Sequence, residues 1–291
     1  MSLENLTFKG GFHMDDHKSY TQNCPLDTNF EPKMVYIPLH QHIGAPCTPI
    51  VKVGDEVKVG QKIGESKATI SAPVHSSVSG KVMKIEQMVL SNGQKGEVVV
   101  IESDGLNELG YTETNDDFTQ LSKEVILERI KEAGIVGLGG AGFPTHIKMK
   151  KKPDVKIEEV ILNGAECEPY LTSDQLNMEL YPQKAIGGLK IIMKLMDCDK
   201  GYIGVEDNKQ KAIGILKNAA KDEKNISICS VKTKYPQGDE RRLINSITGK
   251  KISKAQRSNE RGVQGLNISS AMAIYDAVVH SIPLTHRIVT M

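Results

Sequence analysis

Apolar residues in the first part of the chain occur in short β-branched runs separated by glycine. The runs cover residues 34–39, 49–53, 56–59, 80–85 and 97–102. Strands of this length and spacing are typical of a small β-sandwich or barrel. We therefore predict an all-β domain over residues 34–103. A polar, turn-rich arm over residues 1–33 precedes it, and an acidic linker over residues 104–121 follows it.

The pattern changes after the linker. A helical period begins at residue 122, where Ser122 is the expected N-cap and Val125, Ile126 and Ile130 share one face. Apolar strands and amphipathic helices then alternate: strands at 159–162, 200–205 and 226–232, and helices at 185–196, 208–222, 240–248 and 268–279. Such alternation predicts a mostly parallel α/β domain over residues 122–291. Ligands bind such sheets at the carboxyl ends of the strands.

Composition narrows the class of protein. Of the 291 residues, 39% are hydrophobic and 25% are charged, as in an ordinary globular chain. The net charge of +1 gives no general attraction to nucleic acid. No apolar run approaches the roughly 20 residues of a membrane span, and the N-terminus lacks the pattern of a signal peptide. We expect a cytoplasmic protein without a membrane span.

The five cysteines are dispersed and form no CxxC pair: Cys24, Cys47, Cys167, Cys198 and Cys229. This spacing argues against a disulfide framework and against a thiolate zinc site. It also offers no ligand set for an iron–sulfur cluster built from this chain alone. We expect no metal site.

Two segments carry candidate chemistry. The first, residues 137–145, holds four glycines, Gly137, Gly139, Gly140 and Gly142, and Lys148 follows. Exposed glycine N–H groups can hold a phosphate, although the order fits neither a GxGxxG nor a Walker A motif. A tight loop before a helix is the alternative.

The second segment directly follows the strand at 159–162 and contains Asn163, Glu166 and Glu168. Two carboxylates and an amide at a strand end suit ribityl or ribose hydroxyls and the edge of a flavin or nicotinamide ring. An acidic surface turn is the alternative. Two weaker segments, residues 232–240 and 265–270, also lie beside predicted strands or helices and are ordinary loops when taken singly.

Residues 34–103 resemble the biotinyl/lipoyl-type barrel-sandwich hybrid, on the segments 53–57, 60–63, 72–74 and 79–82. Over nearly the whole chain, the motifs resemble the RnfC family, the C subunits of Rnf-type electron transport complexes. That family is related to the FMN- and NADH-binding subunit of respiratory complex I. The segments that carry this resemblance are 10–13, 41–46, 71–75, 137–148, 163–174, 206–209, 232–240 and 287–290.

The resemblance implies noncovalent FMN that accepts a hydride from NADH. It implies that Gly137, Gly139, Gly140, Gly142 and Lys148 contact FMN on its phosphate and nicotinamide side. Asn163, Glu166 and Glu168 would border the flavin, Gly238 and Glu240 would lie near the NADH approach, and Asn267 near the phosphate or ribityl end. Electrons would pass to other subunits of a membrane complex or to a soluble reductase such as proline reductase. The protein would be cytoplasmic or peripheral on the inner face of the membrane.

Several departures keep alternatives open. The family continues into a region with two iron–sulfur clusters, whose ligands this chain lacks. Ser269 and Ser270 replace a Gly-Thr pair of the family. This replacement supports the alternative function, a docking protein that no longer binds flavin. Cys47 replaces an alanine and is a candidate redox relay, with an inert small residue as the alternative. Lys67 lies near the modified lysine of carrier domains but lacks their flanking signature.

Overall fold

The computed structural model describes residues 3–150 and 154–291. The chain divides into two compact units. The α/β unit comprises Met1–Leu26, Lys151–Tyr275 and Ile288–Met291, and the sandwich unit comprises Asp27–Lys150 and Asp276–Arg287. We describe each unit by itself.

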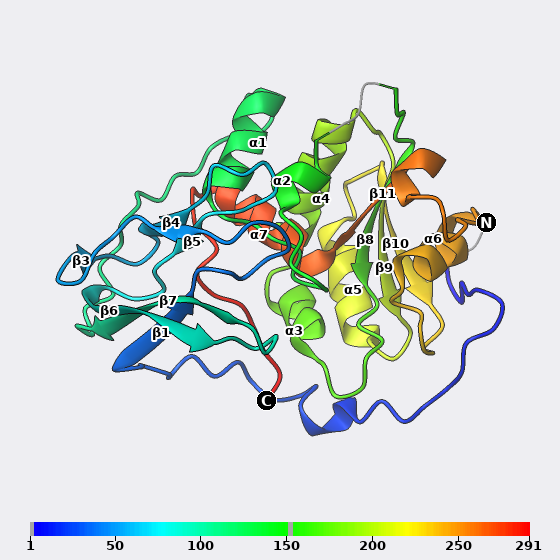
Figure 1. The fold of residues 1–291 in the computed structure, drawn as a ribbon. Helices are drawn as coiled ribbons and strands as arrows, with labels where there is room; N and C mark the ends of the chain where they lie inside the picture. Colours follow the sequence, from blue (N-terminus) through cyan, green and yellow to red (C-terminus); the bar gives the residue numbers. More distant parts are fainter. Residues whose placement is uncertain (1–2, 151–153) are drawn as a thin grey trace. The chain divides into compact units, whose positions relative to one another are not determined.

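A four-stranded parallel sheet forms the centre of the α/β unit, with the order β10-β9-β8-β11 (Figure 1). The strands are β8 (Glu159–Gly164), β9 (Gly201–Glu206), β10 (Ile226–Val231) and β11 (Val263–Asn267). The interior positions of β8, β9 and β10 are mostly apolar and buried, as expected for a sheet that is covered on both faces.

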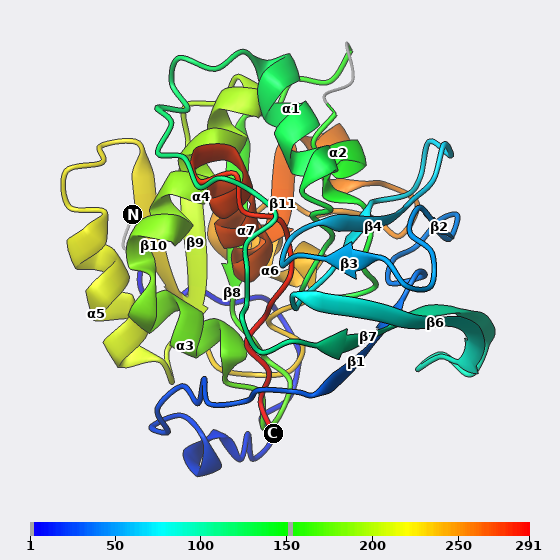
Figure 2. The ribbon, with the colours of Figure 1, turned by 90° about the vertical axis from the view of Figure 1, so that its left-hand side faces the viewer.

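Helices cover both faces of this sheet (Figure 2). A Cβ at Gly201 of β9 would meet Leu189 of α4, whereas a Cβ at Gly204 would meet Leu243 of α6. These two positions point to opposite faces of a strand, so α4 and α6 lie on opposite sides. The helices are α3 (Ser173–Leu180), α4 (Pro182–Met196), α5 (Gln210–Ala219), α6 (Glu240–Thr248) and α7 (Ile268–Val279), with short 3-10 turns at Lys18–Tyr20 and Ser258–Arg261.

The direction of chain progress across the sheet reverses at β8. The chain runs from β8 to β9 and β10 on one side, and then returns through α6 to place β11 on the other side of β8. Open α/β sheets bind ligands at such a reversal, outside the carboxyl ends of the strands. The topology therefore directs attention to the ends of β8 and β11.

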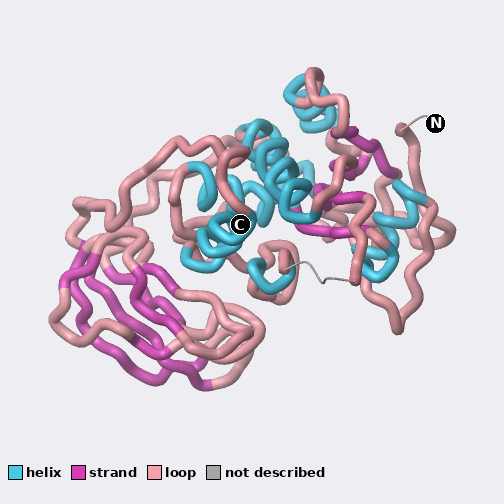
Figure 3. The backbone as a smooth tube through the Cα atoms, turned by 90° about the horizontal axis from the view of Figure 1, so that it is seen from above, coloured by secondary structure: helices cyan, strands magenta, loops and turns pink. Residues whose placement is uncertain are grey.

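Two antiparallel sheets build the sandwich unit, and their strands are among those drawn in magenta in Figure 3. One sheet has the order β1-β7-β6-β3 and the other β2-β4-β5. The strands are β1 (Met34–Pro38), β2 (Thr48–Pro49), β3 (Glu56–Val57), β4 (Lys62–Glu65), β5 (Val74–His75), β6 (Gly80–Val89) and β7 (Lys95–Ser103). Side chains from both sheets form one core, which includes Ile37, Ile63, Val82 and Val99.

Two helices, α1 (Lys123–Glu132) and α2 (Thr145–Lys148), complete the sandwich unit together with the end of α7. Ser122 caps α1 as predicted, since its Oγ accepts a hydrogen bond from the N–H of Val125. Ile126 and Ile130 are buried, but Val125 is exposed. The expectation that Val125 shares one face with Ile126 and Ile130 is wrong, because successive residues lie about 100° apart around a helix and Val125 falls outside the buried face.

The predicted fold class is confirmed: an all-β sandwich followed by a mostly parallel α/β sheet. In the α/β unit, the strand β11 and the helix α3 were not predicted. Gln264 and Gly265 interrupt the apolar pattern of β11, and Gly265 is small because a Cβ there would meet the side chain of Glu240 at 2.9 Å. Among the described residues, no helix is both long and apolar enough to cross a membrane.

Close packing of α4 on α7 depends on Gly188. A Cβ at this position would lie 2.1 Å from the carbonyl oxygen of Ala271, whereas a Cβ at Gly214 of α5 would meet nothing within 4 Å. We predict that Gly188→Ala lowers the free energy of unfolding by about 1–3 kcal/mol. Gly214→Ala should raise it by up to about 1 kcal/mol through helix propensity. Urea denaturation of both variants checks this, and equal effects would contradict the packing argument.

Candidate functional site

The ends of β8 and β11 lie side by side. Asn163 and Asn267 are partners in the parallel register of these two strands, at its last paired position. The Asn163 amide donates to the carbonyl of Gly238 over 2.7 Å, and its Oδ1 accepts from the N–H of Ala165 over 3.1 Å. Gly238 lies in the loop after β10, so residues at the ends of two strands and beyond the end of a third meet at one edge of the sheet. Asn163, Gly238 and Asn267 therefore share this edge.

Glu166 is held by the helix that follows it. Its carboxylate accepts from the N–H of Asp174 at 2.7 Å and, at 3.4 Å, from the Ser173 hydroxyl and the Gln175 N–H. It thus satisfies donors of the first turn of α3. Burial and the nearby Asp174 carboxylate raise the pKa of Glu166 to about 7, although Lys209 acts in the opposite direction. The geometry makes Glu166 a capping residue.

A second polar cluster, which is partly buried, lies at the start of α7. The Asn267 amide donates to Asp174 Oδ2 over 2.8 Å, and the Ser269 hydroxyl donates to Asp174 Oδ1. Asn267 Oδ1 in turn accepts from the N–H of Ser270 over 3.1 Å, which caps α7. Burial raises the pKa of the Asp174 carboxyl. The helix start therefore already faces a carboxylate supplied by the protein.

Two lysine side chains are buried beneath the loop that follows β8. Lys209 Nζ donates to the carbonyl of Ala165 over 2.8 Å and to Glu206 Oε2 over 3.3 Å. Lys18 Nζ donates to the carbonyls of Glu168 and Leu171. Burial and the neighbouring Lys209 charge lower the pKa of Lys18. The loop backbone is thus fixed from below, while the Glu168 side chain is exposed.

Glu240 is the first residue of α6, one position after its N-cap Asp239. The Ser258 hydroxyl donates to its Oε1, and the side chain lies against Gly265 of β11. Gly238 has no room for a side chain, because a Cβ there would lie 2.9 Å from Cys167 Sγ. Gly238 and Cys167 thus meet at the edge of the parallel sheet, whereas Glu240 packs against β11 at Gly265.

The glycine-rich loop belongs to the sandwich unit and is described within it. Gly137 donates its N–H to the carbonyl of Phe143 over 3.0 Å, which closes the loop. Gly142 has φ +68°, and a Cβ there would meet the backbone of Gln41 and His42. Gly139 and Gly140 are exposed, and their N–H groups donate to no other described residue. Lys148 is the last residue of α2.

Two family models match this chain. Residues 6–106 match the RnfC barrel sandwich hybrid domain, and residues 130–276 match the Nuo51 FMN-binding domain. Over 291 residues the chain is 44% identical to the C subunit of the Na(+)-translocating ferredoxin:NAD(+) oxidoreductase complex of Acetobacterium woodii, covering 100% of this chain and 66% of that protein. This chain belongs to the RnfC family.

Other RnfC proteins are similar. The chain is 44% identical over 286 residues to the C subunit of the proton-translocating ferredoxin:NAD(+) oxidoreductase complex of Clostridium ljungdahlii, covering 98% of this chain and 62% of that protein. The chain therefore spans just under two thirds of the length of these two relatives. Among solved structures, an air-oxidised NAD+-reducing NiFe hydrogenase aligns with a TM-score of 0.46 and 23% identity, over 54% of this chain and 30% of that one.

Cys47, which replaces an alanine in the RnfC motif, lies in the core of the sandwich unit. It is 2% exposed, and its Sγ donates to the carbonyl of Ala72 over 3.1 Å. Burial raises the pKa of the thiol. Since the thiolate is the reactive form, this environment lowers the reactivity of Cys47.

Sequence reasoning missed three residues of the α/β site: Asp174, Lys18 and Lys209. Asp174 lies in a helix that the hydrophobic period did not predict. In sequence, both lysines look like ordinary solvated surface residues. Lys209 follows two polar residues and lies at the start of a predicted helix. One signal was available, because the apolar strand that ends at Glu206 predicts a buried carboxylate, which needs a cationic partner nearby.

The pKa of Glu166 predicts a pH-dependent stability. The Glu166 carboxyl stays protonated up to about pH 7 in the folded chain, whereas it ionises near pH 4.5 in the unfolded chain. The free energy of unfolding should therefore fall as pH rises between these values and level off above them. Glu166→Gln should remove this pH dependence. The change in the free energy of unfolding that it removes is up to roughly 3 kcal/mol, since one pKa unit corresponds to about 1.4 kcal/mol.

Urea denaturation at several pH values between about 4.5 and 8 measures this slope. Glu168→Gln is the matched control, since Glu168 lies two positions from Glu166 and its side chain is exposed. The stability of this variant should depend on pH in the same way as that of the wild type. Parallel curves for the wild type and Glu166→Gln would show that Glu166 is not protonated at neutral pH.

The burial of Cys47 predicts slow alkylation. With iodoacetamide at about pH 8, the exposed Cys24 should react readily, and Cys47 at least about a hundred-fold more slowly, because burial covers its thiol and raises its pKa. Peptide mass spectrometry at successive times measures both rates. Comparable rates would mean that Cys47 becomes exposed in solution, as a redox relay requires.

Proposed function

We propose that this chain is an electron-transfer flavoprotein module that binds FMN noncovalently, oxidises NADH and passes the electrons to a partner subunit. The observation that carries the proposal is the match of residues 130–276 to an FMN-binding domain. That range includes the reversal of strand order at β8 and β11, where open α/β sheets bind ligands. FMN, when bound, would supply the chemistry of hydride acceptance and electron release.

The polar groups of the α/β unit fit the hydroxyl-rich part of such a cofactor. Asp174 offers carboxylate oxygens at this edge of the sheet, and the Asn163 amide, which already pairs with Ala165 and Gly238, holds the edge that borders the flavin. Ribityl hydroxyls donate hydrogen bonds, so carboxylate oxygens are suitable acceptors. Asn267 holds Asp174, and we therefore assign it to the ribityl end rather than to the phosphate.

A phosphate group requires free donors. The carboxylate of Asp174 already accepts from Asn267 and Ser269, and its negative charge would repel a phosphate. Gly139 and Gly140 instead have exposed N–H groups without a partner among the described residues. On the family resemblance, we assign Gly137, Gly139, Gly140, Gly142 and Lys148 to the phosphate side of FMN.

The remaining residues receive different roles. We propose that Glu168, whose side chain is exposed, borders the flavin, and that Glu166 acts indirectly by fixing α3 and Asp174. Gly238 leaves the approach to the flavin open for NADH, and Glu240 orients that approach from the start of α6. Hydride transfer itself needs no acid or base from the protein.

The electron acceptor is inferred from the relatives. The proteins of Acetobacterium woodii and Clostridium ljungdahlii are subunits of ion-translocating ferredoxin:NAD(+) oxidoreductase complexes. We therefore favour a membrane complex as the partner over a soluble proline reductase. This assignment places the module at the cytoplasmic face of the membrane, where NADH is available.

The proposal is tested by titrating the purified chain with FMN and then adding NADH without oxygen. We expect binding and loss of the oxidised flavin absorbance. A chain that binds no FMN would instead be a docking protein. Binding of FMN without reduction by NADH would overturn the dehydrogenase assignment alone.

The glycine loop gives a more specific prediction. A Cβ at Gly140 would meet nothing within 4 Å, so a larger residue there should leave the fold intact. Gly140→Val should weaken FMN binding by at least about tenfold by covering the loop N–H groups, and Gly140→Ala should weaken it less. Lys148→Ala should also weaken binding by removing a cation. Unchanged FMN affinity in Gly140→Val and Lys148→Ala would remove the loop from the phosphate site.

A further inference from the structure

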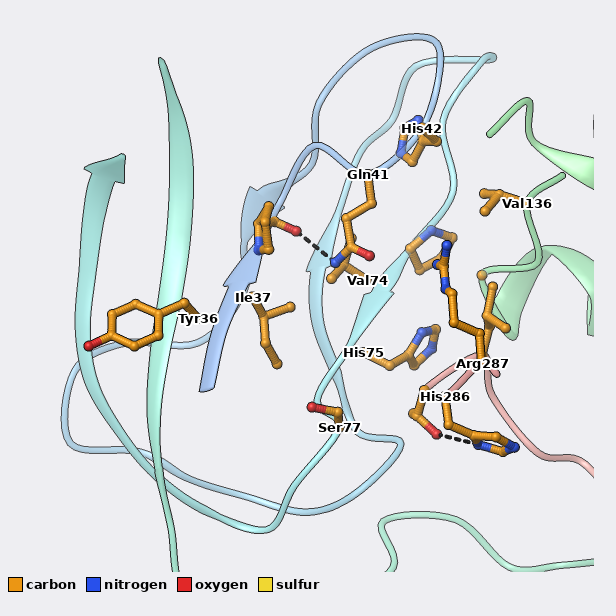
Figure 4. A pocket seen from close by; sticks show the side chains of 15 residues that line it. Tyr36, Ile37, Gln41, His42, Val74, His75, Ser77, Val136, His286 and Arg287 are labelled. Atoms are coloured by element: carbon orange, nitrogen blue, oxygen red, sulfur yellow. Dashed lines mark hydrogen bonds between the residues drawn. The ribbon is translucent and has the colours of Figure 1, made fainter. Parts of the chain in front are cut away.

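A cavity of about 260 Å³ lies within the sandwich unit, and none of its lining residues is assigned to FMN or NADH above. Strands β1 and β5 form one side of it, and the segment after α7 forms the other (Figure 4). Ile37, Val74, Val136 and Leu284 provide apolar surface. The remaining lining residues include Gln41, His42, His75, Ser77, His286 and Arg287. An apolar surface with a few convergent polar groups is the usual composition of a ligand site.

No acidic side chain lines the cavity. The lining contains one guanidinium and three imidazoles. Arg287 is exposed, and its guanidinium forms no hydrogen bond or ion pair with any other described residue. A free guanidinium presents a planar set of donors that matches a carboxylate or phosphate group. The cavity is thus electrostatically complementary to an anion.

His75 provides a second, independent indication. Its side chain is only 8% exposed, and its Nδ1 is buried without a hydrogen-bond partner. Burial and the nearby Lys62 charge lower the pKa of His75 to about 4, against the opposing effect of Glu132, so the ring is neutral at physiological pH. A buried polar atom without a partner costs free energy. Figure 4 shows His75 and Arg287 extending from opposite walls of the cavity.

The other two histidines differ from His75. His42 is engaged through both ring nitrogens, with the carbonyl of Ile43 and with the N–H of Ala72. It therefore shapes the wall and has no donor left for a ligand. His286 is exposed beside Arg287 and contacts the hydroxyl of Thr285 at 3.5 Å. The guanidinium of Arg287 and the Nδ1 of His75 thus keep hydrogen-bonding capacity that a ligand can use.

We propose that this cavity binds a small organic anion, whose carboxylate or phosphate group pairs with Arg287 and whose apolar part packs against Ile37, Val74 and Val136. His75 Nδ1 forms a hydrogen bond to a polar group of the same ligand. The site is separate from the proposed FMN and NADH contacts. It would make the sandwich unit a binding module for a metabolite as well as a structural domain.

The test uses benzoate and phenyl phosphate as probes, with benzyl alcohol as the neutral control. The chain is saturated with FMN, so that a flavin phosphate site is filled before the probe is added. Isothermal titration calorimetry should detect binding of at least one anion and none of benzyl alcohol. Which anion binds more tightly identifies the ligand as a carboxylate or a phosphate ester.

Variants locate the binding. Arg287→Ala should lower the affinity for the preferred anion by at least about tenfold, and Arg287→Lys should lower it by less. Ser77→Phe, which places a ring in the cavity from an exposed position, should also abolish binding. Lys84→Ala removes an exposed cation elsewhere in the same unit and should leave affinity unchanged.

Absence of binding for both anions, equal binding of benzyl alcohol, or full affinity in Arg287→Ala would each overturn the proposal. Failure of FMN to bind would leave the comparison among these variants intact, because none of them changes a residue assigned to the flavin. The two proposals therefore fail independently.

Discussion

Burial of the Lys209 ammonium is the constraint on which the ligand-facing edge of the parallel sheet depends. A buried cation without partners costs several kcal/mol. Here the cost is offset by the carbonyl of Ala165, the carboxylate of Glu206 and the amide oxygen of Asn208. These acceptors lie at the ends of β8 and β9, so one ammonium fixes both ends together. Loss of the Glu206 carboxylate would leave the buried ammonium with only the neutral oxygens of Ala165 and Asn208 as hydrogen-bond acceptors among these three.

The fixed loop then determines the rest of the edge. Glu166 adopts φ +50°, a conformation unusual for a residue with a side chain, and so directs its carboxylate to the first turn of α3. The helix start brings Asp174 to Asn267 and Ser269 at the start of α7. A series of hydrogen bonds therefore runs from Lys209 to α7. Glu166 is buried and Asp174 is partly buried, so each step helps to position the next one.

The sequence predicted where the strands end better than it predicted which residues contact one another at those ends. Asn163 follows a strand whose apolar run was unambiguous, and chain order alone places it beside a ligand edge. The role of Glu166 could not be predicted in this way, because its partner α3 is short and its apolar residues show no clear period. Cys47 is similar: its neighbours in sequence are prolines and polar residues, yet it is buried in the core between the two sheets. These assignments depend on contacts between segments far apart in the chain.

Unused hydrogen-bonding capacity distinguishes residues that support a site from those that can contact a ligand. In the α/β unit, the amides of Asn163 and Asn267 and the carboxylate of Glu166 all have protein partners, so they hold the edge of the sheet in shape. In the sandwich unit, Arg287 and His75 Nδ1 have none among the described residues. A polar residue that a motif singles out is therefore more informative once its partners are known. By this criterion, the proposed role of Glu166 is to support the flavin site indirectly, and the guanidinium of Arg287 is the group that we propose to pair with an anion.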